Sequence, residues 1–158
     1  MLALRFAAVL ALVLWVGGLA VIGGFAAPAT FDVLGPRGAD GRLLAGSVVG
    51  EMLQRFQTAA YACGVVLAAS LAVRAVLGPR PRRFAIRMII AVVMLSAAAY
   101  AGAVVTPRIV QVQRNGGVPP TPDDLRRAEF NRLHSLAMSL QLVPVFGGLA
   151  LLFFELRD

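Results

Sequence analysis

The chain has 158 residues, of which 59% are hydrophobic, and its mean hydropathy is +0.79. An average soluble domain is only about half apolar even when glycine is counted, so a soluble globular protein is excluded. The formal net charge of +7 comes from arginine alone, because the chain has no lysine. Arginines beside apolar segments are typical of membrane-surface anchors, so we expect this charge to meet the lipid bilayer and not nucleic acid.

Four long apolar segments predict four helices that cross a membrane. They cover about residues 2–27, 48–77, 84–106 and 122–156. Each is at least as long as the roughly 20 residues that a helix needs to span the hydrocarbon core. In lipid, the backbone polar groups must be satisfied within the segments. The sequence therefore predicts an all-α fold, an integral membrane antiparallel four-helix bundle that forms a single domain over residues 1–158.

The first predicted helix carries a face of small residues, which would let a neighbouring helix approach closely in lipid. This face comprises Gly17, Ala20, Gly24 and Ala27. We expect it to be the packing centre of the bundle. Pro28 should end or bend the helix, and residues 32–41, which are rich in glycine, should form an irregular joint.

The second predicted helix begins with a polar stripe at helical spacing. The stripe comprises Glu51, Gln54, Arg55, Thr58 and Tyr61. Glu51 and Arg55 stand in the order that favours a helical ion pair. Arg74, near the other end of this helix, is expected to reach outward to the membrane surface.

The joints between the later helices are short or irregular. The one after the second helix is strongly basic, with Arg80, Arg82 and Arg83 among its prolines. Positive loops of this kind stay in the cytoplasm, so both termini are expected on the cytoplasmic side, most simply of a bacterial inner membrane. Residues 115–122, rich in glycine and proline, should form an irregular joint, and Pro144 should kink the fourth helix.

The fourth predicted helix carries a second polar stripe. It comprises Arg127, Asn131, His134, Met138 and Gln141. Polar groups at membrane depth are costly, so they usually turn inward, find partners and often mark function. Both stripes begin at the same surface, and we expect Glu51, Arg55 and His134 to lie within mutual reach. Together the two stripes are the candidate ligand site.

The residues that could carry chemistry are few. His134 and Met138, with Met52 across the bundle, are the candidate ligands for copper or haem. One histidine is too little for a tight metal site, so no metal and no cofactor is predicted. The alternative role of His134 is structural, as a hydrogen-bond partner of Glu51, Tyr61 or a backbone carbonyl. No complete catalytic, nucleotide or metal motif occurs in the sequence, so we do not expect an enzyme.

Three functions follow as hypotheses. The first is transport or handling of a small ligand or cation through the two polar stripes. The second is a structural or assembly role, in which the small-residue faces dock the protein onto copies of itself or onto a larger membrane complex. The third is a haem-binding or copper-binding membrane protein that uses His134 as a ligand.

Several short motifs resemble a known family. They are Trp15-Val16-Gly17-Gly18, Ala27-Pro28 followed by Phe31, Gly41-Arg42, and Phe130-Asn131 followed by Leu133-His134. In these the chain is similar to the small bacterial four-helix membrane proteins classed as domain of unknown function 4149, related to the transmembrane-protein-205 group. The resemblance implies a four-helix integral membrane protein with no settled activity. It also implies that Trp15, Pro28, Phe31 and His134 occupy recurring positions of that family.

Overall fold

The computed structural model describes residues 2–77, 83–114 and 125–157, and every element in these ranges is helical. The first span consists of α1 (Leu2–Val21), the π-helical turn η1 (Ile22–Ala26), α2 (Ala27–Leu34) and the 3₁₀ turn η2 (Gly35–Arg37). The second span is α3 (Ala39–Leu77). The third consists of α4 (Phe84–Tyr100), the π-helical turn η3 (Ala101–Val105) and α5 (Thr106–Arg114), and the fourth span is α6 (Leu125–Arg157).

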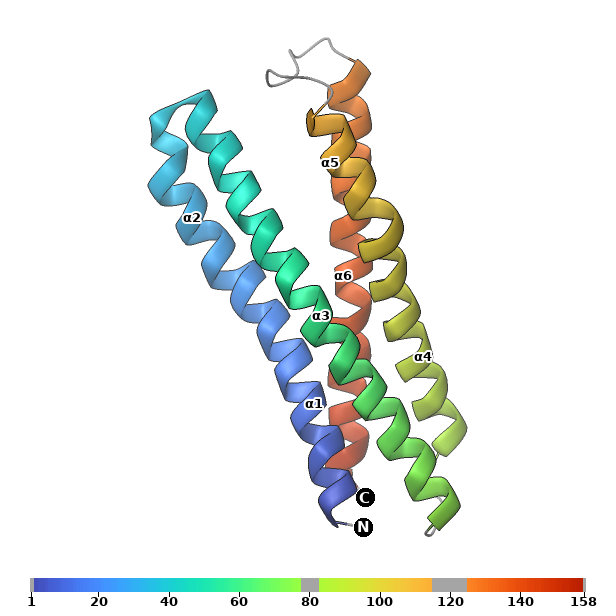
Figure 1. The fold of residues 1–158 in the computed structure, drawn as a ribbon. Coiled ribbons are helices and arrows are strands. Elements are labelled where there is room, and N and C mark those ends of the chain that lie inside the picture. Colours follow the sequence, from blue (N-terminus) through green and yellow to red (C-terminus); the bar gives the residue numbers. More distant parts are fainter. Residues whose placement is uncertain (1, 78–82, 115–124, 158) are drawn as a thin grey trace.

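All four spans are long and apolar enough to cross a membrane. They run antiparallel, and both chain termini lie at the same end of the bundle (Figure 1). We call this the terminal end, and the opposite one the far end. The predicted fold is thus confirmed: the protein is an integral membrane four-helix bundle. The basic joint and residues 115–122 fall largely or wholly outside the described residues.

Two prolines that directly follow the predicted helix ends at residues 27 and 106, Pro28 and Pro107, lie inside continuous spans. The first span continues past Pro28 to Arg37, and the third continues past Pro107 to Arg114. A proline lacks an N–H and its ring crowds the carbonyl four residues earlier. In both spans a π-helical turn immediately precedes the proline-containing segment, and its extra residue absorbs this mismatch. The predicted ends at residues 27 and 106 are therefore wrong.

The joint between the first two spans is far tighter than the sequence suggested. Residues 32–37 are helical, and the chain reverses at Gly38, whose φ of 88° favours glycine. A Cβ at Gly41 would collide with the backbone oxygen of Leu34. Glycines here allow two helices to meet at a corner, so α3 begins at Ala39 and not near residue 48.

The core is formed by large side chains that meet glycines on neighbouring helices. Trp15 and Met94 are fully buried. A Cβ at Gly64 would lie 3.0 Å from the ring of Trp15 and 2.7 Å from Leu95. A Cβ at Gly147 would lie 2.8 Å from Met94. These contacts bring α1, α3, α4 and α6 together by the close approach that stabilises helices in lipid.

The packing face predicted on the first helix lies elsewhere than expected. That face comprises Gly17, Ala20, Gly24 and Ala27. At Gly17 and Gly24 a Cβ would meet nothing within 4 Å. The close approach is made at Gly18, where a Cβ would collide with the ring of Phe56. The bundle-facing side of α1 is set by Trp15, and Gly18 follows it by one helical turn, so the prediction that Gly17 and Gly24 pack within the bundle is wrong.

The bundle is not equally closed along its length. In Figure 1 the first two spans form one hairpin and the last two form another, and the hairpins separate toward the far end. There, α2 packs on α3, and α5 packs on α6. Among the described residues, α2 forms no comparable packing with α5 or α6. At the far end, the described helices therefore pack mainly within their own hairpin, whereas all four spans pack together at the terminal end.

Candidate functional site

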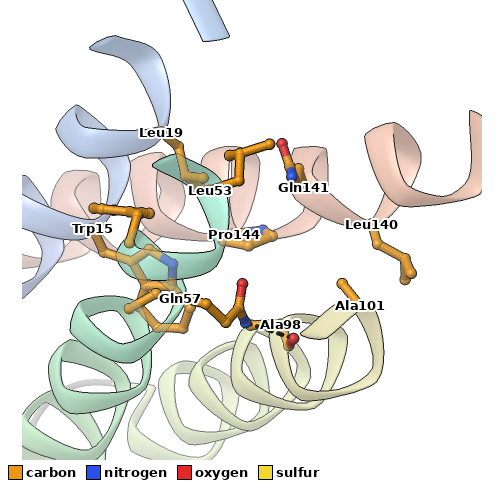
Figure 2. Close-up of a pocket in the computed structure, with 11 residues that line it drawn as sticks. Trp15, Leu19, Leu53, Gln57, Ala98, Ala101, Leu140, Gln141 and Pro144 are labelled. Carbon is orange, nitrogen blue, oxygen red and sulfur yellow. Dashed lines mark hydrogen bonds between the residues drawn. The ribbon is translucent and has the colours of Figure 1, made fainter. Parts of the chain in front are cut away.

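A small cavity lies in the middle of the bundle, between the two hairpins. All four spans contribute to it, whereas α2 and α5 do not. Its lining includes Trp15, Leu53, Phe56, Gln57, Gln141 and Pro144 (Figure 2). The cavity volume is about 20 Å³, enough for one water molecule, which needs about 10–15 Å³. We call it the inter-hairpin cavity.

The walls of the inter-hairpin cavity are apolar apart from three groups. Gln57 donates a hydrogen bond from Nε2 to the carbonyl oxygen of Ala98, at 2.7 Å. Figure 2 shows the amide oxygen of Gln57 turned toward Pro144 and the amide of Gln141 across the same space. The indole ring of Trp15 forms another wall, and its N–H is a hydrogen-bond donor. No lining residue is charged.

The polar stripe predicted on the second helix is only partly connected to this cavity. Arg55 donates from Nε to Glu51 Oε1 at 2.7 Å, which confirms the predicted pair, and both side chains are exposed. Gln54 and Thr58 are exposed as well. The hydroxyl of Tyr61 lies 3.4 Å from the carbonyl oxygen of Ala98, which also accepts the bond from Gln57.

Helix geometry explains why the charged part of this stripe misses the cavity. Leu53 lines the cavity, and Glu51 and Arg55 each lie two residues from it along α3. Two residues turn a helix by about 200°, which places both charges on the opposite face. Helical spacing correctly places Glu51, Gln54, Arg55 and Thr58 on one side, but it does not tell whether that side meets the neighbouring helices.

Most described residues of the polar stripe on the fourth helix likewise point away from the cavity. Asn131, His134 and Met138 are exposed, and Gln141 alone of the stripe lines the cavity. His134 stacks on Phe130, with ring centroids 5.9 Å apart and an interplanar angle of 10°. The side chain of Arg127 lies outside the described part of the chain.

The described contacts do not join the two stripes at Glu51, Arg55 and His134. Glu51 and Arg55 bond to each other, and the ring contact of His134 is within its own helix. Among the described residues, no group of three or more His, Cys, Asp or Glu side chains lies close enough to hold a metal ion. Met52, the third candidate ligand, is exposed on α3. A shared ligand site of the two stripes stays a prediction.

A second polar site, not predicted from the sequence, lies at the terminal end. Each span contributes one charged residue near a helix end: Arg5, Arg74, Arg87 and Glu155. Glu155 and Arg87 are buried, with 3% and 2% of their surface exposed. We call these four residues the Glu155 cluster.

In the Glu155 cluster, Glu155 contacts one arginine from each of the other three spans. Glu155 Oε1 accepts from Arg74 Nη1 at 2.8 Å and from Arg87 Nη1 at 2.9 Å. Arg5 Nε lies 3.5 Å from Glu155 Oε2, and Arg5 Nη2 donates to the Glu155 backbone oxygen. Arg87 Nη2 donates to the carbonyl oxygen of Phe154 at 3.0 Å. Charge-assisted bonds of this kind are the strong ones in proteins, so the cluster ties all four spans together.

The prediction that Arg74 reaches outward to the membrane surface is wrong. Its side chain turns inward to Glu155. Its side chain is only 12% exposed. The sequence did hold a usable signal. Glu155 is a carboxylate in the last turn of an apolar helix, and an antiparallel bundle brings that turn beside the ends where Arg5, Arg74 and Arg87 lie.

Comparison with known proteins adds a family but no activity. A family model described as domain of unknown function (DUF4149) matches residues 10–117, which is more than half of the chain. The matched segment contains Trp15 and Gln57 and ends before α6, so Gln141 and Glu155 lie outside it. No curated protein and no solved structure matches the chain.

Proposed function

Because the chain belongs to the DUF4149 family, whose description names no activity, we propose a function from the inter-hairpin cavity. The protein handles a small, membrane-soluble ligand whose hydrogen-bonding end occupies this cavity. The observation that carries the proposal is the presence of the Gln57 and Gln141 amides and the Trp15 indole in an otherwise apolar lining. Apolar walls with a few convergent polar groups are the usual composition of small-molecule sites.

The size and charge of the cavity narrow the class of ligand. About 20 Å³ accommodates a hydroxyl or carbonyl end, and not a whole substrate. The rest of such a molecule would extend into the apolar region between the hairpins. An uncharged lining favours a neutral ligand over a cation, since a desolvated cation needs a negative partner. Entry from the bilayer is supported by the lack of comparable packing of α2 with α5 or α6 among the described residues.

Trp15 makes the proposal directly testable, because it is the only tryptophan in the chain. We would measure quenching of its fluorescence in nanodiscs by 2-bromo-1-octanol and by 2-bromooctane, which differ in the hydroxyl alone and carry the bromine close to that end. Saturable quenching by the alcohol is expected, weakened in Gln57→Leu and Gln141→Leu. Thr58→Val, an exposed change beside Gln57, is the matched control. Equal, unsaturable quenching by both compounds in all variants would overturn the proposal.

An assembly role is the second candidate, and open glycines on the surface favour it. A Cβ added at Gly17 or Gly24 would meet nothing within 4 Å, and Ala20 between them is exposed. A second helix could therefore approach this face closely. Disulfide crosslinking of Ala20→Cys in native membranes tests it. A crosslinked product with the mass of two chains or of a heterologous pair is expected, and an uncrosslinked monomer would exclude the face.

We also propose that the bundle lies in a bacterial inner membrane with both termini in the cytoplasm. The proposal is supported by Arg80, Arg82 and Arg83, which fall in one short joint between α3 and α4. Thiol labelling of intact cells that carry Arg82→Cys or Gly116→Cys, in a background without Cys63, tests it. Labelling of Gly116→Cys but not of Arg82→Cys from outside is expected, and the reverse pattern would refute it.

A further inference from the structure

The terminal end of the bundle holds more positive charge than its buried carboxylate can neutralise. In the Glu155 cluster, three guanidinium groups, of Arg5, Arg74 and Arg87, contact one carboxylate. Among these four described side chains, arginine outnumbers carboxylate by three to one. A surface that is richer in arginine than in carboxylate attracts anions, so this end of the bundle favours the approach of an anion.

Two more arginines lie beside the last turns of α6, each over an aromatic ring. The guanidinium of Arg83 lies 5.9 Å from the ring centroid of Phe154, and that of Arg157 lies 5.2 Å from the ring of Phe153. Both arginines are exposed at the same end of the bundle. Aromatic faces hold such cations in place while their N–H groups stay free to bind. The terminal end therefore presents two exposed guanidinium groups beside α6 in addition to those of the cluster.

The depth of the cluster suits the headgroup layer of a bilayer. Arg74 lies in the last turn of α3 and Arg87 in the first turn of α4. Each span is long enough to cross the hydrocarbon core, so residues in its terminal turns lie near the boundary between the acyl chains and the headgroups. The Arg5 side chain is 38% exposed and gives access from outside. Guanidinium groups match phosphate oxygens in geometry as well as in charge.

The surface beside the arginines favours a lipid over a soluble phosphate. Large apolar side chains at the same helix ends are exposed, among them Leu2, Phe6, Val76, Ile86 and Phe153. A free phosphate ion gains nothing from contact with an apolar surface, whereas the acyl chains of a phospholipid would cover it. Basic pockets between membrane helices on one side of the bilayer bind anionic headgroups.

We propose that the terminal end is a binding site for an anionic phospholipid, whose phosphate contacts Arg5, Arg74, Arg83 and Arg157 around the Glu155 cluster. Its acyl chains lie along the exposed apolar side chains of the four helix ends. The site is distinct from the inter-hairpin cavity and does not depend on the function proposed for it. It would make the terminal end a lipid-anchored base for the bundle.

The test compares lipids that differ in charge alone. Purified protein in neutral detergent is titrated with phosphatidylglycerol, with phosphatidylcholine of the same chains, and with inorganic phosphate. Thermal unfolding is followed, and bound lipids are counted by native mass spectrometry. Phosphatidylglycerol is expected to stay bound and to raise the unfolding temperature, with little effect of the other two. Equal effects of both lipids would overturn the proposal, and an equal effect of inorganic phosphate would show a soluble-anion site instead.

The variants leave Glu155 and its three partners unchanged. Arg83→Gln combined with Arg157→Gln removes two arginines that do not contact Glu155. Each should weaken phosphatidylglycerol binding about fivefold, or about 25-fold together, by the usual contribution of an arginine near a charged membrane surface. The matched control is Arg108→Gln combined with Arg132→Gln, two exposed arginines outside the terminal end. Equal weakening by the control pair would overturn the site, and if the first pair does not fold, the comparison of the two lipids with wild-type protein still decides.

Discussion

The terminal end and the far end of this bundle use polar residues in opposite ways. At the terminal end, Glu155 and Arg87 are buried, and their contacts join all four spans. Toward the far end, Glu51 and Arg55 pair within one helix, and both side chains are exposed. A buried charge must find partners on other helices, whereas an exposed one is satisfied locally. Among the described residues, charged side chains thus join the helices to each other at the terminal end, whereas the Glu51 to Arg55 pair stays within one helix.

The largest expected effect comes from breaking the buried cluster. Glu155→Gln removes the carboxylate that Arg5, Arg74 and Arg87 all contact, and should lower the free energy of unfolding by about 3–5 kcal/mol. Denaturant titration in detergent micelles measures it. Glu51→Gln removes a carboxylate from the exposed pair and serves as the control. Similar losses in the two variants would abolish the contrast between the ends.

A glycine series on one helix would show where tight packing stops. Gly64→Ala forces a Cβ against Leu95 and Trp15 and should cost about 1–3 kcal/mol of stability. At Gly46 and Gly50, nearer the far end of the same helix, a Cβ meets nothing within 4 Å. Substitution by alanine there should be neutral or stabilising, by up to about 1 kcal/mol, because alanine favours the helix. Destabilisation by Gly50→Ala as large as by Gly64→Ala would mean that the helices pack as closely around Gly50 as around Gly64.

At the border between the two regions, Gln57→Leu removes the hydrogen bond to the carbonyl oxygen of Ala98. The expected loss is about 0.5–1.5 kcal/mol, toward the low end because the Tyr61 hydroxyl lies 3.4 Å from the same oxygen. Thermal unfolding of Gln57→Leu, of Tyr61→Phe and of the double variant measures it. If the double variant loses no more than Gln57→Leu alone, Tyr61 does not serve as the second donor.

The smallest expected effect is that of the exposed pair at the far end. A double-mutant cycle with Glu51→Gln and Arg55→Gln should give a coupling of about 0.3–0.5 kcal/mol, decreasing as salt is added. The measurement is the unfolding free energy of the four proteins at low and high ionic strength. A coupling well above 1 kcal/mol that does not respond to salt would place this pair in a buried site.

The sequence was sufficient for those features that depend on one helix at a time. Span number and the Glu51 to Arg55 pair follow from apolar length and from helical spacing, and both agree with the structure. The placement of Gln141 beside the cavity could also be anticipated, as part of a stripe that was expected to turn inward.

Features that depend on pairs of helices could not be read in the same way. In lipid, an apolar side chain fits both the bundle core and the membrane-facing surface, so hydrophobic pattern does not tell which face of α1 meets α3. For this reason the sequence predicted that Gly17 faces the bundle, whereas Gly18 does. Likewise, Arg74 has an outward alternative that is equally compatible with its position, and only the location of Glu155 on another helix decides against it.

The two π-helical turns have a mechanical consequence. One follows the 20 residues of α1 and the other follows the 17 residues of α4, both counted from the terminal end. In each, the regular ladder of backbone hydrogen bonds is interrupted, and a proline shortly afterwards removes one more donor. The first and third spans are therefore most compliant at a similar height. Beyond this height, each of the two spans continues for about 15 Å, by the rise of a helix. Both turns lie outside the part of each span that the Glu155 cluster holds together.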